Sequence, residues 1–351
     1  MHLLPTQFVA SPIHHPDGAV ARLAGGLLWF AAYEVRANGN RRIVPVPEVH
    51  TLGERAQALH RAITAPRPPL QLGERTLRFD QPQIVGILNV TPDSLYGGGA
   101  HSADPDAAAA AGIAMLTAGA ALIDLGGEST RPGAQPVWEG DELARVIPAI
   151  ERLARAGAPI SVDTRKSTVM DQALLAGAHL VNDVSALLWD DRSMEVVVRA
   201  GCPVVLMHSP APKKGGNGHP GYQDVVTDVF DWLEARIAAV VAAGVDRAKI
   251  IADPGIGSGS FGKSLAENLQ LLNALPLFHG LGVPLMLGAS RKRLIGALSN
   301  EAPADQRLGG SLALAMAGLD AGVQLLRVHD VAETVQATRV WRGLRDQALV
   351  G

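Results

Sequence analysis

From residue 84 onward, one pattern recurs along the chain. A short apolar run rich in Val, Ile or Leu ends in a glycine or polar cluster, and a longer stretch with helical periodicity follows. The apolar runs lie at residues 84–89, 121–125, 159–163, 180–182, 203–207, 249–252, 284–287 and 323–328. Runs that are apolar on both faces and alternate with helices are typical of a buried parallel sheet with crossover helices.

The number and length of these units match a closed barrel. Eight units within residues 84–345 are the content of a (β/α)8 barrel. The helices are expected at about 104–119, 139–157, 167–177, 191–200, 222–244, 264–275, 305–320 and 331–346. A doubly wound open sheet is the alternative, but it usually has fewer strands in this length. We therefore predict an α/β protein in which residues 81–351 form a (β/α)8 TIM barrel.

Residues 1–80 do not follow this alternation. They contain an expected strand near 27–35, a basic tract at 36–42, an expected helix near 52–63 and a proline-rich stretch at 65–69. The proline-rich stretch is typical of a linker or an extended strap. We predict an N-terminal extension over residues 1–80, to which the sequence assigns no chemistry.

Composition excludes several classes of function. Of the 351 residues 47% are hydrophobic, and the net charge is −3, which argues against a protein that coats nucleic acid or binds a membrane through a polybasic surface. No segment has the roughly 18 consecutive apolar residues of a membrane helix, and the N-terminal residues lack a signal-peptide pattern. The single cysteine, Cys202, excludes an internal disulfide and suits a reducing compartment. We expect a cytoplasmic protein.

Polar residues gather at the carboxyl ends of the apolar runs, where barrel enzymes place their reacting groups. They are Asn89, Asp124, Asp163, Asn182, His208, Asp253, Ser290, Arg291, Lys292, Arg327 and His329. A single Asp or Asn after a strand is commonly a helix cap or turn former, and we prefer that reading for Asp124 taken alone. Polar residues at every strand end require an explanation beyond capping, because burying charges and amides costs free energy unless they pair or hold a ligand.

These residue types indicate a planar polar ligand rather than a metal cage. Acceptors, an amide and cationic donors that can read the edge of a heterocycle are present at Asp163, Asn182, Asp253, Lys292 and Arg327. Cations suited to phosphate or pyrophosphate oxygens are present at Arg131, Arg327 and His329. The predicted ligand is therefore a flat heterocycle that carries a phosphate group.

Eight segments at these strand ends resemble the dihydropteroate synthases of the folate pathway, in the family's order. They are ILNVTPDS (87–94), DLGGESTRP (124–132), SVDT (161–164), VNDV (181–184), MH (207–208), DPG (253–255), GASRK (288–292) and RVHD (327–330). The resemblance covers residues 84–345. It implies that the chain condenses 6-hydroxymethyl-7,8-dihydropterin pyrophosphate with 4-aminobenzoate, releases pyrophosphate and uses Mg²⁺. It also implies a homodimer and a sulfonamide target.

The resemblance assigns roles residue by residue. It places the pterin edge on Asp163, Asn182, Asp253 and Lys292, with Met207 against the ring. It places Arg327 on the pterin and, with His329, on the pyrophosphate, and it assigns Asn89 to Mg²⁺. The aminobenzoate would be framed by Thr130, Arg131, Pro132 and Ser290. The implied catalytic residues are Asp163, Asp253, Lys292 and Arg327.

Three loops depart from the family pattern. LYGGG stands at 95–99, where the family usually has FSDGG; SPAP stands at 209–212; and the loop at 256–263 is about three residues longer. The first departure keeps a non-catalytic pterin-binding paralogue open, and a pterin-dependent methyltransferase is a further alternative. Residues 257–264 also match a P-loop, and residues 257–262 match the dinucleotide fingerprint of NADP-binding proteins, although such motifs usually follow the first strand of their folds.

Overall fold

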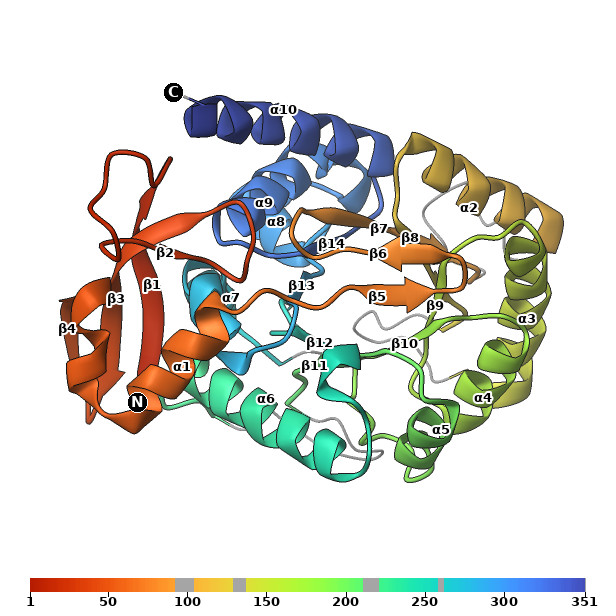
Figure 1. The fold of residues 1–351 in the computed structure, drawn as a ribbon. Coiled ribbons are helices and arrows are strands. Elements are labelled where there is room, and N and C mark those ends of the chain that lie inside the picture. Colours follow the sequence, from red (N-terminus) through yellow and green to blue (C-terminus); the bar gives the residue numbers. More distant parts are fainter. Residues whose placement is uncertain (92–103, 129–136, 211–220, 258–261, 351) are drawn as a thin grey trace.

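An eight-stranded parallel sheet forms the centre of the computed structural model, which describes residues 1–91, 104–128, 137–210, 221–257 and 262–350 (Figure 1). Its strands are β7 (Gln83–Asn89), β8 (Leu122–Gly126), β9 (Ile160–Asp163), β10 (Leu180–Asp183), β11 (Val204–Met207), β12 (Ile250–Asp253), β13 (Met286–Leu287) and β14 (Leu325–Val328). The order is β12-β11-β10-β9-β8-β7-β14-β13, and a parallel bridge between Ala252 and Leu285 joins the two ends. The predicted (β/α)8 barrel is confirmed.

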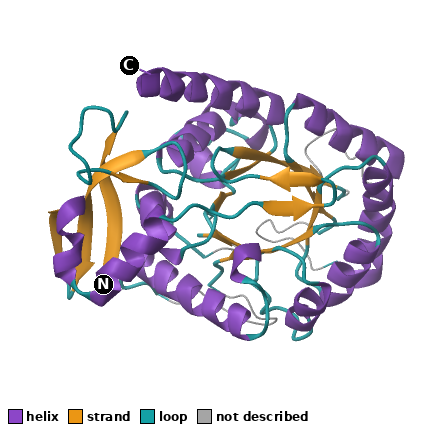
Figure 2. Ribbon diagram, viewed as in Figure 1, coloured by secondary structure: helices purple, strands orange, loops and turns teal. Residues whose placement is uncertain are grey.

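Helices surround this sheet (Figure 2). They are α2 (Pro105–Ala118), α3 (Glu139–Arg155), α4 (Ser167–Leu175), α5 (Ser193–Ala200), α6 (Val225–Ala242), α7 (Leu265–Asn273), α8 (Arg293–Leu298), α9 (Leu308–Asp320) and α10 (Val331–Val350). The helix starts follow ordinary capping chemistry: the Asp224 carboxylate accepts from Val226 N at 3.0 Å, and Ser264 forms a capping box with Glu267. The six-residue α8 was not predicted, because so short a helix has little periodicity.

A β-hairpin closes the amino end of the barrel. It consists of β5 (Leu70–Leu72) and β6 (Arg75–Leu77), and it lies across the strands in Figure 1. Its apolar residues and Phe79 share a buried cluster with residues near the start of seven barrel strands, namely Val85, Leu122, Leu180, Val205, Ile251, Met286 and Leu325. Because this end is filled with apolar side chains, the polar site is left to the carboxyl end.

The N-terminal extension is an antiparallel sheet with a helix. Strand β3 (Trp29–Ala37) pairs with β1 (His2–Val9), β2 (Ala21–Arg22) and β4 (Asn40–Pro45). After β4 the chain forms the 3₁₀ helix η1 (Val46–Leu52) and the helix α1 (Glu54–Thr64). The expected strand and helix are confirmed, whereas the basic tract at 36–42 forms the end of β3, a turn and the start of β4. Tyr33 is buried and its hydroxyl bonds His60 Nδ1 at 2.7 Å.

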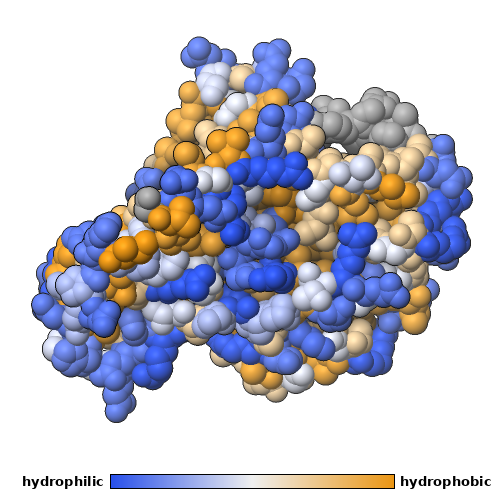
Figure 3. Space-filling view, turned by 45° about the horizontal axis from the view of Figure 1, so that its top comes forward, coloured by the Kyte–Doolittle hydropathy of each residue, from blue (hydrophilic) through white to orange (hydrophobic). Residues whose placement is uncertain are grey.

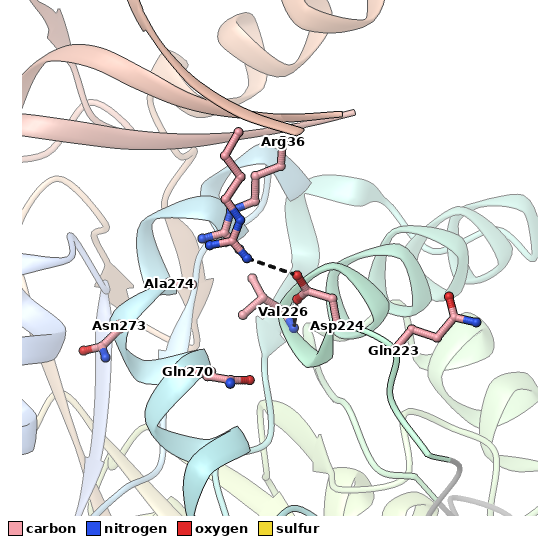
Figure 4. Close-up of a pocket in the computed structure, with 8 residues that line it drawn as sticks. Arg36, Gln223, Asp224, Val226, Gln270, Asn273 and Ala274 are labelled. Atoms are coloured by element: carbon pink, nitrogen blue, oxygen red, sulfur yellow. Dashed lines mark hydrogen bonds and ion pairs between the residues drawn. The ribbon is translucent and has the colours of Figure 1, made fainter. Parts of the chain in front are cut away.

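The extension packs on the outside of the barrel, against α6 and the 3₁₀ helix η4 (Leu275–Leu281). His2 Nε2 lies 2.6 Å from Asp231 Oδ1, and Arg67 Nη2 donates to His279 O at 2.9 Å. A polar hollow of about 430 Å³ remains between β3, β4, α6 and α7, where Arg41 lies 3.5 Å from Asp224 (Figure 4). Buried apolar side chains of the extension and of the barrel belong to one continuous core.

Figure 3 shows small apolar patches interspersed with hydrophilic residues on the face that it presents. Within the described ranges, no helix is both long enough and apolar enough to span a membrane.

Candidate active site

Asp124 is the centre of a buried polar network at the carboxyl end of the barrel. It lies on β8 and is 1% exposed. Its Oδ2 accepts from Arg327 Nε at 2.5 Å and from Asn182 Nδ2 at 2.9 Å, while Ser161 donates to its other oxygen. The preferred reading of Asp124 as a helix cap or turn former was wrong, because its carboxylate instead joins β9, β10 and β14.

Arg327 links this network to Asp163. Its Nη2 donates to Asp163 Oδ2 at 2.5 Å, so one guanidinium spans two carboxylates. Burial opposes the charge on Arg327, but Asp124 and Asp163 outweigh it and raise the pKa of the guanidinium. Burial raises the pKa of Asp163 to about 7, with Arg327 acting against this shift and Asp124 adding to it. The Asp163 carboxyl can therefore exchange a proton near neutral pH.

Asp253 lies on the opposite side of the same opening. It is 4% exposed at the end of β12, and its Oδ1 accepts from Gly255 N at 2.7 Å. Burial raises the pKa of Asp253, while Gly255 N–H and the cations Lys292, Arg327 and Lys263 act against that rise. A Cβ at Gly288 would lie 3.7 Å from Asp253 Oδ2 and 3.9 Å from Arg327 Cδ, so both side chains border one space.

Lys292 supplies a second cation to this space. Burial lowers the pKa of its ammonium to about 8, and Asp253 and Asp163 act against that shift. Met207 is paired in register with Asp253 and is buried beside it. The mouth thus combines carboxylates, an amide and two cations with an apolar wall, which suits a flat heterocycle with both donors and acceptors.

Ser290 and His329 form a further pair at this end. Ser290 Oγ lies 3.1 Å from His329 Nδ1 and accepts from His329 N at 3.2 Å. Next to Ser290, the Arg291 guanidinium makes a two-point contact with Asp330 at 3.0 and 2.5 Å. The Arg291–Asp330 ion pair therefore helps to keep the Ser290 hydroxyl and the His329 ring next to each other.

Comparisons with known proteins agree with this geometry. The family model described as "Pterin binding enzyme" matches residues 85–329. The dihydropteroate synthase of Neisseria meningitidis serogroup B is 44% identical over 277 residues, which cover 78% of this chain and 96% of the relative. The chain belongs to the dihydropteroate synthase family.

Solved structures of the dihydropteroate synthase family have the same fold. One from Xanthomonas albilineans, with 4-aminobenzoic acid, is 46% identical with a TM-score of 0.73, covering 80% of this chain and 98% of that one. One from Yersinia pestis, with a sulfonamide drug complex, is 43% identical with a TM-score of 0.73, covering 80% and 100%. The family model begins after the N-terminal extension.

The predicted dihydropteroate synthase residues fall into three groups. The structure joins Asp163, Asn182 and Arg327 through Asp124, and it places Asp253, Lys292 and Met207 around the same opening. Asn89, Ser290 and His329 also lie at the carboxyl end. Thr130, Arg131 and Pro132 lie outside the described residues, as do the departure at 95–99 and half of each of those at 209–212 and 256–263.

A second ionic cluster beside the mouth was missed. Glu128 is 8% exposed and accepts from Arg165 Nη2 and Lys166 Nζ, both at 2.9 Å. Burial alone would raise the pKa of Glu128, but these two cations lower it overall. The fully buried Glu142 of α3 also accepts from Lys166. The signal was present in the sequence, because Arg165 and Lys166 directly follow the SVDT segment.

Proposed function

We propose that the mouth of this barrel catalyses the dihydropteroate synthase reaction. In this reaction 6-hydroxymethyl-7,8-dihydropterin pyrophosphate and 4-aminobenzoate give dihydropteroate and pyrophosphate, so the chain is a transferase of folate biosynthesis. The observation that carries the proposal is the network at the strand ends, in which Arg327 bridges Asp124 and Asp163. Burying charges costs free energy unless they pair or hold a ligand, and this bridge keeps two carboxyl groups at the opening that Asp253 also borders.

The proposed pterin site is the space between Asp163, Asn182 and Asp253. The carboxylates would accept hydrogen bonds from the amino and ring N–H groups, and Lys292 would donate to the carbonyl. Met207 would pack against the ring. The support for this assignment is the position of Asp253 and Arg327 on either side of Gly288 and the buried amide of Asn182.

The proposed chemistry is substitution at the methylene carbon of the pterin. The C–O bond breaks and its electron pair leaves with the pyrophosphate, the amine nitrogen of aminobenzoate forms the new C–N bond, and that nitrogen loses a proton. Arg327 and His329 would stabilise the charge that grows on the pyrophosphate, while Asp163 and Asp253 would offset positive charge on the ring. Aminobenzoate would bind near Thr130, Arg131, Pro132 and Ser290.

Mg²⁺ fits the chemistry of this mouth. The Asn89 amide oxygen lies near Asp163 at the end of β8, because a Cβ at Gly126 would lie 3.4 Å from that oxygen and 3.4 Å from Asp163 Cβ. Mg²⁺ commonly takes one or two protein oxygens and completes its shell with substrate phosphates and water. Asn89 would hold the ion, which would supply neutralisation of the pyrophosphate charge.

The experiment that tests this function is direct. Purified full-length protein is incubated with Mg²⁺, the pterin pyrophosphate and 4-aminobenzoate, and dihydropteroate is measured. We expect product from the wild type, loss of product in Lys292→Ala, and normal product in Lys249→Ala, a matched lysine outside the site. Pterin binding without product would favour the second candidate, a non-catalytic pterin-binding paralogue, which the LYGGG departure at 95–99 supports.

Binding measurements test the assignment of Asp253. Calorimetry should show that Asp253→Ala loses about 1.5–3 kcal/mol of pterin binding, the usual worth of a charged hydrogen bond. Unchanged affinity would remove Asp253 from the site. The sulfonamide in the Yersinia pestis relative leads us to propose that sulfonamides compete with 4-aminobenzoate here as well.

Three further expectations belong to this proposal. The chain would act as a cytoplasmic homodimer, and residues 1–80 would be an N-terminal extension packed on the barrel at 81–351. Light scattering of the full-length chain tests the dimer, and limited proteolysis near residue 80 tests the boundary.

A further inference from the structure

Lys263 is a buried cation that the proposed reaction does not use. It is 2% exposed, and its Nζ donates to Gly255 O at 2.7 Å. The sequence pattern suggested that it could bind nucleotide phosphates, but in the structure the ammonium turns back to its own chain. Ser264, the next residue of that pattern, is the N-cap of α7.

Asn268 makes the complementary contacts from α7. It is fully buried, its Oδ1 accepts from Gly257 N at 2.7 Å, and its Nδ2 donates to Ser264 O at 2.8 Å. Lys263 and Asn268 therefore tie the start of the glycine-rich loop, at 255 and 257, to its end, at 263 and 264. This is the loop that is about three residues longer than the family pattern.

The tied turn directly follows Asp253. Gly255 N donates to Asp253 Oδ1, and Gly255 O accepts from Lys263, so one residue connects the carboxylate to the ammonium. Gly255 has φ +73°, and a Cβ there would lie 2.1 Å from His208 O. The turn therefore has little freedom to shift without moving Asp253.

We propose that Lys263, together with Asn268, is a positioning residue for pterin recognition, which fixes the turn after Asp253 and holds a cation behind its carboxylate. This inference rests on the proposed function of Asp253. It gives a role to a residue that the family resemblance and the proposed mechanism left without one, and it explains how the longer loop can keep the same carboxylate in place.

The charges around Lys263 define its pH behaviour. It faces Asp253, Lys292, Glu267 and His208. Burial lowers the pKa of Lys263 to about 7, with Asp253 acting against the shift, and lowers the pKa of His208 to about 2, so His208 stays neutral from pH 5 to 9. Removing the Lys263 cation should raise the pKa of Asp253, because an opposite charge nearby favours the carboxylate.

The first test needs no substrate. In full-length protein labelled with ¹³C at the Asp carboxyls, the Asp253 signal is assigned with Asp253→Asn and titrated. We expect Lys263→Met to raise the Asp253 midpoint by about one pH unit, and Lys263→Arg, which keeps the cation, to restore most of it. Lys249→Met is the matched control, because Lys249 Nζ also donates to a glycine carbonyl, Gly201 O at 2.6 Å, but on the surface. An Asp253 midpoint that moves no further in Lys263→Met than in this control overturns the proposal.

The second test measures pterin affinity between pH 5.5 and 8.5. In Lys263→Met the acid-side loss of affinity should begin about one pH unit higher, giving up to a tenfold deficit there and a smaller one above pH 8. An affinity deficit of the same size at all pH values would show that Lys263 only supports the turn mechanically. It would overturn the proposed effect of the Lys263 charge on Asp253. Lys263→Gln replaces the Met variant if that chain does not fold. If Asp253→Ala binds pterin with normal affinity, the proposed function fails. If Asp253→Ala loses affinity but Lys263→Met keeps it, only the present inference about Lys263 fails.

Discussion

Replacing Asp124 with Asn tests whether this carboxylate really organises the mouth. The change keeps the side-chain shape but removes the charge and turns one oxygen into a donor. The Oδ2 atom accepts from both Arg327 and Asn182, and the other oxygen accepts from Ser161. In one orientation the new NH2 group faces the donors Arg327 and Asn182; in the other it faces Ser161 Oγ, which can rotate to accept, so that only the charge is lost.

The magnitude follows from these contacts. A charged hydrogen bond contributes about 1.5–3 kcal/mol, and stranding one partner of a buried ion pair costs about 3–5 kcal/mol. Arg327 keeps Asp163, so the full cost of a stranded charge does not apply. We expect a loss of about 3 kcal/mol in the free energy of unfolding, which for a chain of 351 residues corresponds to a fall of roughly 4 °C in Tm.

Urea unfolding at pH 8, followed by circular dichroism, measures this loss. The matched control is Asp171→Asn, whose exposed carboxylate pairs with Arg199 at 2.6 Å and should contribute less than about 1 kcal/mol. A second signature is a lower pKa for Asp163, because the Asp124 charge helps to raise it. If Asp124→Asn is no less stable than Asp171→Asn, the central role of Asp124 is refuted.

Three further predictions concern pH, the hairpin and the turn after β12. The pKa of Asp163 is raised to about 7 from its usual value near 3.8, so the folded chain holds this proton more tightly and the associated stability is lost as pH rises from about 4 through 7. Asp163→Asn should remove that part of the pH dependence of the free energy of unfolding, measured with urea. An unchanged pH dependence would contradict the assignment. Phe79→Ala should cost about 3–5 kcal/mol of stability but leave kcat/KM at 25 °C unchanged, since Phe79 packs at the amino end; a large loss of kcat/KM in folded protein would argue against that separation. Gly255→Ala should weaken pterin binding more than tenfold, whereas Gly39→Ala, with a similar φ of +75° and nothing within 4 Å, should leave pterin binding unchanged; equal affinities would show that the contact with His208 O does not matter.

Local patterns in the sequence were enough to predict the barrel. Each apolar run became a strand within about two residues, because strands buried on both faces need apolar residues throughout. The ends of these strands then predicted the site residues, since parallel strands bring their carboxyl ends to one edge. The extension was predicted less well: its first strand and the hairpin at 70–77 were missed, because neither has an uninterrupted apolar run.

The hydrogen bonds and ion pairs between the site residues could not be predicted in the same way. The direction of a side chain depends on contacts between residues far apart in the sequence, such as Asp124 and Arg327. A capping role was the better local explanation of Asp124, and only the closed barrel brings Arg327 to it. Lys263 was hidden for a similar reason, because its partner Gly255 lies on the far side of a glycine-rich loop.

The bridge that Arg327 makes between Asp124 and Asp163 has a consequence for inhibitor design. The guanidinium already occupies Asp163 Oδ2, so a compound that addresses this oxygen must exchange one hydrogen bond for another. Measured affinities will then report the difference between the two bonds, and a strong contact to Asp163 can be largely cancelled. Compounds that leave the Arg327–Asp163 pair intact and gain their contacts at Asp253 and Lys292 avoid this exchange.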